Sequence, residues 1–94
     1  MQLTRSMAKF TLGQLLITPG ASNALTTDDV LTALSRHLDG DWGDVCGEDR
    51  GSNDEALQHG ARLLSVYHAE DGTKFWVIAE WNRFSTNILL PREY

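Results

Sequence analysis

The chain has 94 residues, an apolar fraction of 41% and a formal net charge of −5 at pH 7. This length fits one domain with a small stability margin, because such a domain buries only roughly 60–65% of the surface of its unfolded chain. The negative charge argues against direct nucleic-acid binding and against an anionic membrane surface, since both need clustered lysine and arginine.

The single cysteine, Cys46, excludes an internal disulfide bond and favours a reducing compartment, so we expect a cytoplasmic protein. No apolar run approaches the roughly 20 residues that a membrane-spanning helix needs. Residues 1–8 are too few and too polar for a secretory signal. We therefore expect a flexible tail over residues 1–8, a single α+β domain over residues 9–94, and no membrane partner.

The first apolar run, residues 10–17, fits either a short strand or a buried turn of helix, because its periodicity does not separate the two. Thr18 and Pro19 then mark a helix start. A threonine side chain can cap the first amides of a helix, and proline loses nothing at the first helical position. This pattern predicts a short helix that ends near Leu25.

A second helix is predicted from Thr26 or Thr27 to the stop signal at Gly40. Asp28 and Asp29 would lie in its first turn, where the helix dipole favours negative charge. Its apolar residues recur at helical spacing and predict one buried stripe. The stripe consists of Val30, Leu31, Leu34 and Leu38.

Residues 39–55 change character, since they contain seven acidic side chains and only one basic residue. Ser52 and Glu55 match a capping box, in which two side chains cap each other's backbone amides. The motif predicts a helix from Ser52 to His59, and a start nearer Glu48 is an open alternative.

The last third of the chain has an apolar period of two, which indicates β-strands. Three strands joined by tight turns are predicted, over residues 62–68, 73–81 and 85–90. Asp71 and Gly72 supply the positive φ that a hairpin turn needs. We therefore expect an α+β fold with two or three short helices packed on a C-terminal three-stranded antiparallel meander. An extra N-terminal edge strand is left open.

The central strand of this meander has large side chains on both of its faces. A helix should cover one face of the sheet, and a partner or a second copy of the chain should cover the other. A homodimer is therefore an expected arrangement.

No pattern of catalytic or cofactor chemistry stands out. The glycines around residue 43 have the wrong spacing for a phosphate-binding loop and lie among acids. The three histidines lack the spacing of a helical metal-ligand set. Ser65, Ser85 and Cys46 lie outside any nucleophile-elbow motif. We predict no catalytic residue, no metal site and no cofactor.

The acidic segment is the leading functional candidate. Clustered carboxylates attract basic surfaces over long distances, including grooves that normally hold nucleic acid. We therefore predict a protein partner that is bound through Asp39, Asp41, Trp42, Asp44, Glu48 and Asp49. The competing interpretation is a solvated loop whose carboxylates only cap helices.

Two other functions stay open. Barnase-like and RelE-like ribonucleases place a helix pair before an antiparallel sheet and use polar side chains on the sheet to hold phosphate and move protons. The residues that would do this here are Tyr67, Glu80, Arg83, Thr86 and Tyr94. The simpler interpretation makes Arg83 a turn residue that pairs with Glu80 or the acidic segment. A third possibility is an oligomeric domain that binds a small ligand.

Several motifs within residues 9–94 resemble one family. They include Gly40-Asp-Trp-Gly-Asp44, Asn53-Asp54, Arg62-Leu-Leu-Ser65, Trp76-Val-Ile78 and Ile88-Leu-Leu-Pro91-x-Glu93-Tyr94. With these residues the chain resembles the small "plasmid-related" proteins carried on bacterial plasmids and integrative elements. The resemblance implies no established activity, and by analogy it suggests element maintenance or evasion of host defence by a non-enzymatic inhibitor. Asn82 departs from the family pattern, in which an acid is usual at this position.

Overall fold

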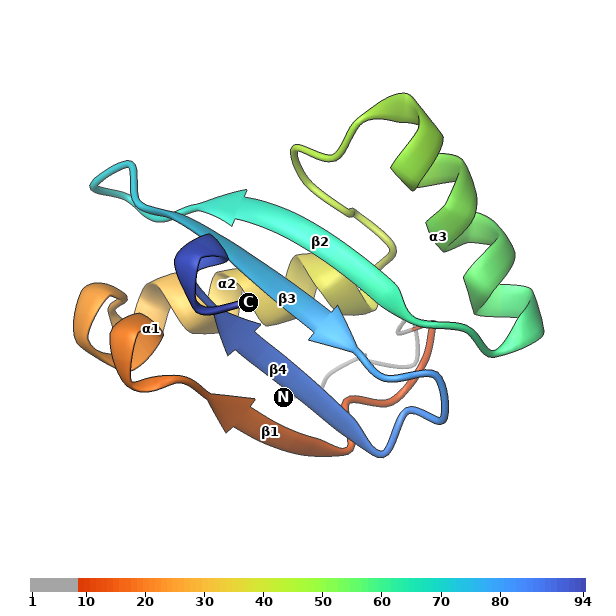
Figure 1. Cartoon of the computed structure of the whole chain (residues 1–94), viewed down its shortest axis with the longest axis horizontal. Coiled ribbons are helices and arrows are strands. Elements are labelled where there is room, and N and C mark those ends of the chain that lie inside the picture. The colour runs from red at the N-terminus through yellow and green to blue at the C-terminus, as the bar shows by residue number, and fades with distance from the viewer. Residues whose placement is uncertain (1–8) are drawn as a thin grey trace, which may run out of the picture.

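A computed structural model describes residues 9–94 and shows an α+β fold built on one four-stranded sheet (Figure 1). The tail expected over residues 1–8 lies outside the described residues. The strands are β1 (Gln14–Ile17), β2 (Leu63–His68), β3 (Lys74–Ala79) and β4 (Ser85–Leu89). The helices are α1 (Pro19–Ala24), α2 (Thr27–Leu38), α3 (Gly47–His59) and the 3₁₀ turn η2 (Pro91–Glu93).

The strand order is β1-β4-β3-β2, which confirms the predicted antiparallel meander of β2, β3 and β4. The choice left open for residues 10–17 is resolved in favour of a strand at the sheet edge. This strand, β1, pairs with β4 in the parallel direction, with Ile17 beside Ile88. The sheet is therefore mixed and not purely antiparallel. Parallel neighbours need a long crossover, and here α1, α2, α3, β2 and β3 all lie between β1 and β4 in the chain.

The two helix starts predicted before residue 40 are confirmed. Thr18 caps α1, since its side-chain oxygen accepts a hydrogen bond of 3.3 Å from the amide of Ala21. Thr26 and Asp29 form a reciprocal capping box at α2, in which each side chain accepts a hydrogen bond of 3.0 Å from the other's backbone amide. These bonds satisfy N–H groups that have no partner inside a helix.

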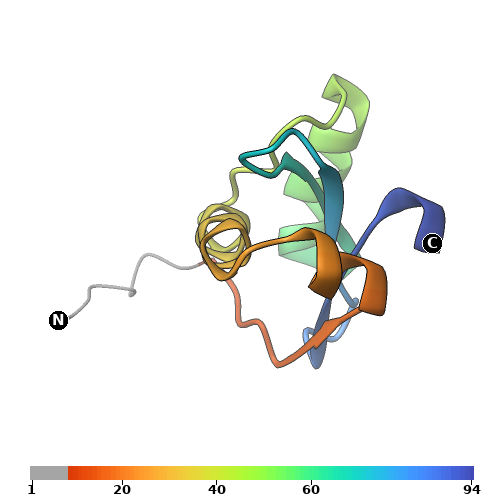
Figure 2. The same ribbon diagram turned by 90° about the vertical axis from the view of Figure 1, so that its left-hand side faces the viewer.

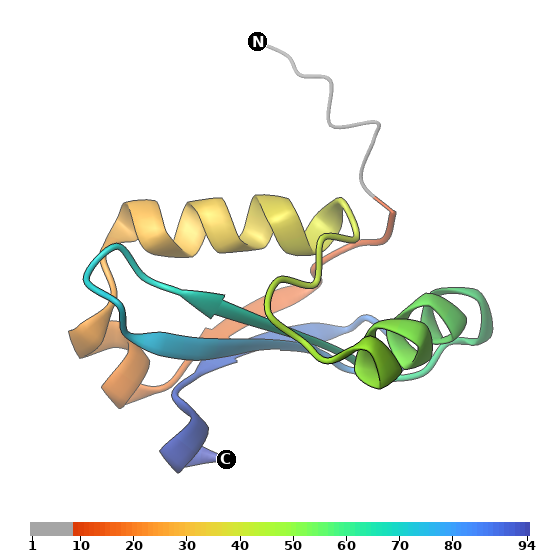
Figure 3. The same cartoon turned by 90° about the horizontal axis from the view of Figure 1, so that it is seen from above.

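Helix α2 covers one face of the sheet (Figure 3), but its buried stripe is rotated from the predicted one. Ala33, Leu34 and His37 are its buried residues, whereas the predicted core residue Leu31 is 59% exposed. The small Ala33 side chain lets the helix approach the sheet closely. His37 is buried because a serine on β2 satisfies one of its ring nitrogens, and a count of apolar residues misses it.

Helix α3 begins before the predicted capping box. Its first residue is Gly47, and its N-cap residue, Cys46, makes no side-chain hydrogen bond. Ser52 is thus an exposed mid-helix residue, so the predicted start at Ser52 is wrong and the alternative near Glu48 is confirmed. Glu48 and Asp49 favour the earlier start, because they lie in the first turn at the positive end of the helix dipole.

The outer edge of β2 is closed by the segment that precedes it in the chain. Helix α3 lies beyond this edge (Figure 1), and its Asn53 side chain pairs with Leu64 like a neighbouring strand. Asn53 Nδ2 donates to the Leu64 carbonyl at 2.7 Å, and the Leu64 amide donates to Asn53 Oδ1 at 3.1 Å. Next to it, Val66 exchanges backbone hydrogen bonds of 3.0 and 2.8 Å with Trp42 and Asp44.

The second sheet face is covered in part by the chain's own C-terminal segment. Figure 2 shows α2 and η2 on opposite sides of the sheet. The ring of Tyr94 meets the Trp76 indole edge-on, with centroids 5.4 Å apart. This contact covers part of the face that was predicted to need a partner or a second copy.

Candidate functional site

Two of the six predicted partner-binding residues belong to the scaffold. Trp42 is 3% exposed, and its indole N–H donates a hydrogen bond of 3.1 Å to Asp54 Oδ1. Asp41 accepts from Arg36 Nε at 2.7 Å and from the amide of Gly43 at 3.2 Å. The hydrogen bond from Arg36 lowers the pKa of Asp41. These side chains hold the turn between α2 and α3 in place.

The other four predicted residues are exposed acids. They are Asp39, Asp44, Glu48 and Asp49. None of them makes an ion pair within residues 9–94, where the ion pairs are Arg36–Asp41 and Arg62–Glu80. The nearby base, Arg50, donates instead to the carbonyl of Val45 at 3.4 Å. No described side chain therefore forms an ion pair with the acids at the start of α3.

The backbone that carries these exposed acids is held on the sheet by hydrogen bonds. The backbone of Asp44 is held on β2 by its hydrogen bond of 2.8 Å to Val66, and α3 is held by Asn53. Only Asn53 and Ala56 of α3 are buried, so most of the helix surface faces solvent. A helix that is polar nearly all round packs against little of its own protein. Its position leaves the acidic first turn open to another molecule.

The structure separates the residues of the predicted ribonuclease cluster. Tyr67 and Thr86 are buried on the α2 side, where Tyr67 Oη donates to the carbonyl of Asp41 at 2.5 Å and Thr86 Oγ1 donates to that of Leu12 at 2.7 Å. Burial raises the pKa of Tyr67 to about 12. Its hydroxyl therefore keeps its proton at neutral pH and acts as a structural donor.

Glu80 and Tyr94 lie on the opposite face and share Arg62. Arg62 Nη1 donates to Tyr94 Oη at 2.9 Å, and Arg62 Nε lies 3.9 Å from Glu80 Oε1. Asn87 Nδ2 also donates to Glu80 at 3.3 Å. Arg62 and Glu80 are half-exposed, and Arg62 and Tyr94 border a hollow of about 310 Å³ whose lining is mostly apolar. The hollow is lined by Arg62, Leu63, Leu64, Trp76, Ile78 and Tyr94.

Arg83 is a turn residue, as the simpler interpretation of the sequence predicted, and its side chain also bonds α3 and a residue just after it. Its guanidinium donates to the carbonyls of Ala61 at 2.6 Å, Glu80 at 2.7 Å and Ala56 at 3.1 Å. The residue has a φ of 60°, an unusual value for a residue other than glycine. Arg83 thereby joins the β3–β4 turn to the C-terminal end of α3. The predicted pairing of its side chain with Glu80 is to the backbone carbonyl and not to the carboxylate.

A buried histidine–serine pair is the feature that sequence reasoning missed. His37 Nδ1 lies 2.5 Å from Ser65 Oγ, and neither residue has exposed surface. The rings of Phe10 and Trp42 meet the imidazole edge-on. Burial, with a smaller effect of Arg83, lowers the pKa of His37 to about 4, so the ring is neutral at pH 7. The sequence did contain one signal for the burial of His37: it follows Ala33 and Leu34 at helical spacing and so lies on the same face of α2.

This pair resembles part of a nucleophile–base arrangement but has no access to a substrate. A serine needs a neighbouring base and an open approach to attack a substrate, and the hydroxyl of Ser65 is enclosed on all sides. His37 Nε2 has no hydrogen-bond partner among residues 9–94. The arrangement is a polar contact of the core, where an unpaired nitrogen costs stability.

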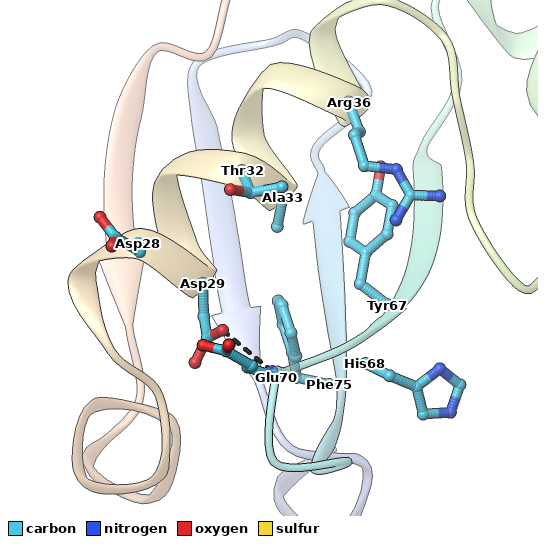
Figure 4. A pocket seen from close by; sticks show the side chains of 9 residues that line it. All are labelled: Asp28, Asp29, Thr32, Ala33, Arg36, Tyr67, His68, Glu70 and Phe75. Carbon is cyan, nitrogen blue, oxygen red and sulfur yellow. Dashed lines mark hydrogen bonds between the residues drawn. The ribbon is translucent and has the colours of Figure 1, made fainter.

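A second hollow, of about 280 Å³, lies between α2 and the β2–β3 hairpin (Figure 4). Asp28, Asp29 and Glu70 line one end, and Arg36 and His68 line the other. Asp29 is already engaged there, because its Oδ1 accepts a hydrogen bond of 3.1 Å from the Glu70 amide and Oδ2 accepts from the amide of its capping box. These bonds lower the pKa of Asp29.

Residues 9–94 contain no group of three histidine, cysteine, aspartate or glutamate side chains placed to hold a metal ion. Among the same residues, no helix has the length and apolarity needed to cross a membrane. Comparisons with protein-family models, curated proteins and solved structures found no match. The functional argument therefore depends on the residues of this chain.

Proposed function

We propose that this chain is a non-enzymatic interaction module that binds a basic protein surface through the acids at the start of α3. The observation that carries the proposal is the exposed set Asp44, Glu48 and Asp49, which make no ion pair within residues 9–94; Glu48 and Asp49 lie in the first turn of α3 and Asp44 lies just before it. Asp39 lies exposed at the end of α2 and adds to the same charge. Asp41 and Trp42 contribute by holding this surface in place.

The electrostatics of the whole chain favour such a partner. A net charge of −5 on a small domain attracts basic proteins at long range and repels phosphate backbones. Since α3 buries little of its own surface, a partner could contact it without rearranging the core. Pre-organised charges bind with a smaller loss of side-chain and backbone freedom than a flexible acidic tail.

The resemblance to plasmid-related proteins extends the proposal to a biological setting. A cytoplasmic protein encoded on a mobile element gains from occupying the basic groove of a defence or maintenance protein, because that groove otherwise holds nucleic acid. The acids of α3 would then take the place of phosphates. We propose an inhibitor of this kind as the function of the chain.

The test is a pull-down from host lysate with matched charge variants. The wild-type chain should retain a protein partner after nuclease treatment and lose it at high salt. Glu48→Lys with Asp49→Lys should abolish retention. Asp28→Lys with Glu70→Lys changes the net charge equally and should keep it. Asp28, like Glu48 and Asp49, lies in a first helical turn, so the control also loses a favourable dipole contact. Equal retention by both variants would contradict the proposal.

The ribonuclease alternative needs a different test, since Arg83 supports the backbone. Loss of RNA cleavage in Arg83→Ala would not separate chemistry from folding. The decisive measurement is cleavage of RNA by the purified wild-type chain. Activity that survives a salt wash and follows the protein through two columns would favour the nuclease.

The hollow beside Trp76 and Tyr94 supports a second candidate function, the binding of a small ligand. Its apolar floor, two aromatic rings and the Arg62 guanidinium suit a flat molecule with a negative group. The fluorescent aromatic sulfonate anilinonaphthalene sulfonate is a direct probe. Binding by the folded wild type that is lost in Arg62→Ala would support this function, and equal binding by both chains would contradict it.

A further inference from the structure

The two edges of the sheet differ in whether their backbone N–H and C=O groups have hydrogen-bond partners. The β2 edge is closed by Asn53 and by residues 42–44, whereas β1 occupies the other edge and no described strand lies beyond it. Figure 1 shows β1 at the sheet edge opposite α3. An open edge strand presents a row of unpaired N–H and C=O groups that can pair with another strand.

The parallel register identifies which groups on β1 are free. The amide of Gln14 donates to the carbonyl of Phe84, just before β4, at 2.8 Å, and the amide of Thr18 donates to that of Ile88 in β4 at 3.0 Å. Backbone groups of alternate residues in a strand point to opposite sides, so the groups of Leu15 and Ile17 point away from the sheet. These side chains are also open to solvent, with Leu15 and Leu16 43% exposed and Ile17 40% exposed.

We propose that β1 pairs with β1 of a second copy of this chain in an antiparallel arrangement centred on Leu16. In that register Leu15 of one copy faces Ile17 of the other, and each such pair exchanges both of its backbone hydrogen bonds. The two Leu16 side chains meet on the two-fold axis. Every outward group of Leu15 and Ile17 is satisfied, and the two sheets become one continuous sheet.

The distribution of charge selects a second copy over a basic or acidic partner. Strand β1 contains no charged residue, although the chain carries a net charge of −5. The acids of α3 lie at the far edge, so a β1–β1 dimer keeps the acidic surfaces of its two copies apart (Figure 1). A charged partner would find no complementary group on this edge, whereas an uncharged apolar strand matches another of the same kind.

An uncharged hollow beside β1 enlarges the contact. It has a volume of about 210 Å³ and lies where β1, α1 and α2 meet. All of its lining residues are uncharged: Ile17, Ser22, Leu25, Thr26, Thr27, Val30 and Leu31. Leu15 of the second copy would lie opposite Ile17 on this side of the sheet, because Leu15 and Ile17 share the face that carries Thr86 and Ile88. The exposed Leu31 would then be covered.

The test measures the oligomeric state of the wild-type chain and of a variant with a charged residue on the two-fold axis. The wild-type chain should have twice the mass of one chain by size-exclusion chromatography with light scattering. Leu16→Glu places two like charges opposite each other and should raise the dissociation constant of the dimer at least about tenfold. Trp81→Glu adds the same charge at the exposed β3–β4 turn and should leave the dimer unchanged.

Leu15→Pro is a second variant, which keeps the inference testable if Leu16→Glu fails to fold. Its lost amide points outward, so the β1–β4 ladder is kept, and proline is tolerated on such an edge. It should also give a folded monomer. Hydrogen exchange adds a site-specific measurement: the Leu15 and Ile17 amides should be protected in the dimer and exposed on dilution. A monomeric wild type at millimolar concentration, or a folded Leu16→Glu that stays dimeric, overturns the inference.

This dimer does not depend on the proposed function, because the acids of α3 and β1 lie at opposite sheet edges. The variants separate the two: Leu16→Glu should still retain a basic partner, and Glu48→Lys with Asp49→Lys should still dimerise. A monomeric wild type that retains a partner would overturn only the dimer.

Discussion

His37 and Ser65 form a polar pair at the centre of the core, with 2.5 Å between the imidazole Nδ1 and the serine hydroxyl. The pair joins α2 to β2, and both residues are without exposed surface. It replaces an apolar contact at the point where the helix lies on the sheet. A titratable group in this position makes the stability of the fold depend on pH.

The free energy of unfolding should fall as the pH drops below about 6.5, the ordinary pKa of histidine. The pKa of His37 is lowered to about 4 in the folded chain, so the unfolded chain takes up a proton first. The stabilisation that the neutral His37 gives is complete above about pH 6.5, the pKa of histidine in the unfolded chain. It is lost as the pH falls to about 4, the pKa of His37 in the folded chain, and the total loss is on the order of 3 kcal/mol. Urea unfolding between pH 7.5 and 4 measures it.

His37→Gln is the variant that isolates this effect, since glutamine can still bond Ser65 but does not titrate. It should flatten the decline between pH 6.5 and 4, while the exposed His59→Gln should leave the decline intact. Carboxylates with lowered pKa values, such as Asp29 and Asp41, destabilise the fold on further acidification in both variants. Identical pH profiles for His37→Gln and the wild type would contradict the assignment.

Arg83→Ala should destabilise the fold by about 2–3 kcal/mol, because it removes charge-assisted hydrogen bonds to four backbone carbonyls. Thermal or urea unfolding measures the loss. Arg83→Lys should recover only part of it, since one ammonium group cannot reproduce the planar fork. Arg92→Ala is the control, as Arg92 has no such bonds among residues 9–94. A loss in Arg83→Ala no greater than in the control would contradict this role.

Asn53→Asp should destabilise the fold by about 2–3 kcal/mol although it changes few atoms. The variant loses the donor to the Leu64 carbonyl and places a carboxylate oxygen against that carbonyl in a buried position. Amide exchange at Leu64 should also become faster, because its bond to Asn53 anchors the β2 edge. A stable variant with unchanged exchange would show that α3 is held by other contacts.

Ser52→Ala separates the observed start of α3 from the one predicted from sequence. A serine N-cap is typically worth about 1 kcal/mol, whereas an exposed mid-helix serine loses less than about 0.5 kcal/mol on replacement by alanine or even gains stability. We expect the smaller effect, since Ser52 lies inside Gly47–His59. Chemical unfolding of the two chains is sufficient, and a loss of 1 kcal/mol or more would place the cap at Ser52.

Much of the secondary structure could be predicted from local signals. Thr18 before Pro19, and Thr26 three residues before Asp29, are helix starts whose side chains bond amides a few residues away. The strands of the meander follow from alternating apolar residues and from turns such as Asp71-Gly72. These features need no distant partner, so the sequence alone is sufficient to identify them.

The placement of functional side chains could not be predicted in the same way. Trp42 and Asp41 were predicted to bind a partner, yet Trp42 is buried and bonded to Asp54, and the exposed Asp41 is engaged by Arg36. Tyr67 and Tyr94 share a strand-rich region of the sequence but lie on opposite faces of the sheet. Such assignments depend on which chain segments meet.

The sequence by itself determined that the chain forms helices followed by an antiparallel meander and carries a concentrated negative charge. Only the tertiary structure decided that β1 is parallel to β4 and that His37 is buried against Ser65. The physical reason is the range of the interactions. Caps, turns and periodic burial act over a few residues, whereas strand order and polar contacts of the core join residues such as Thr18 and Glu93 that are far apart in the chain.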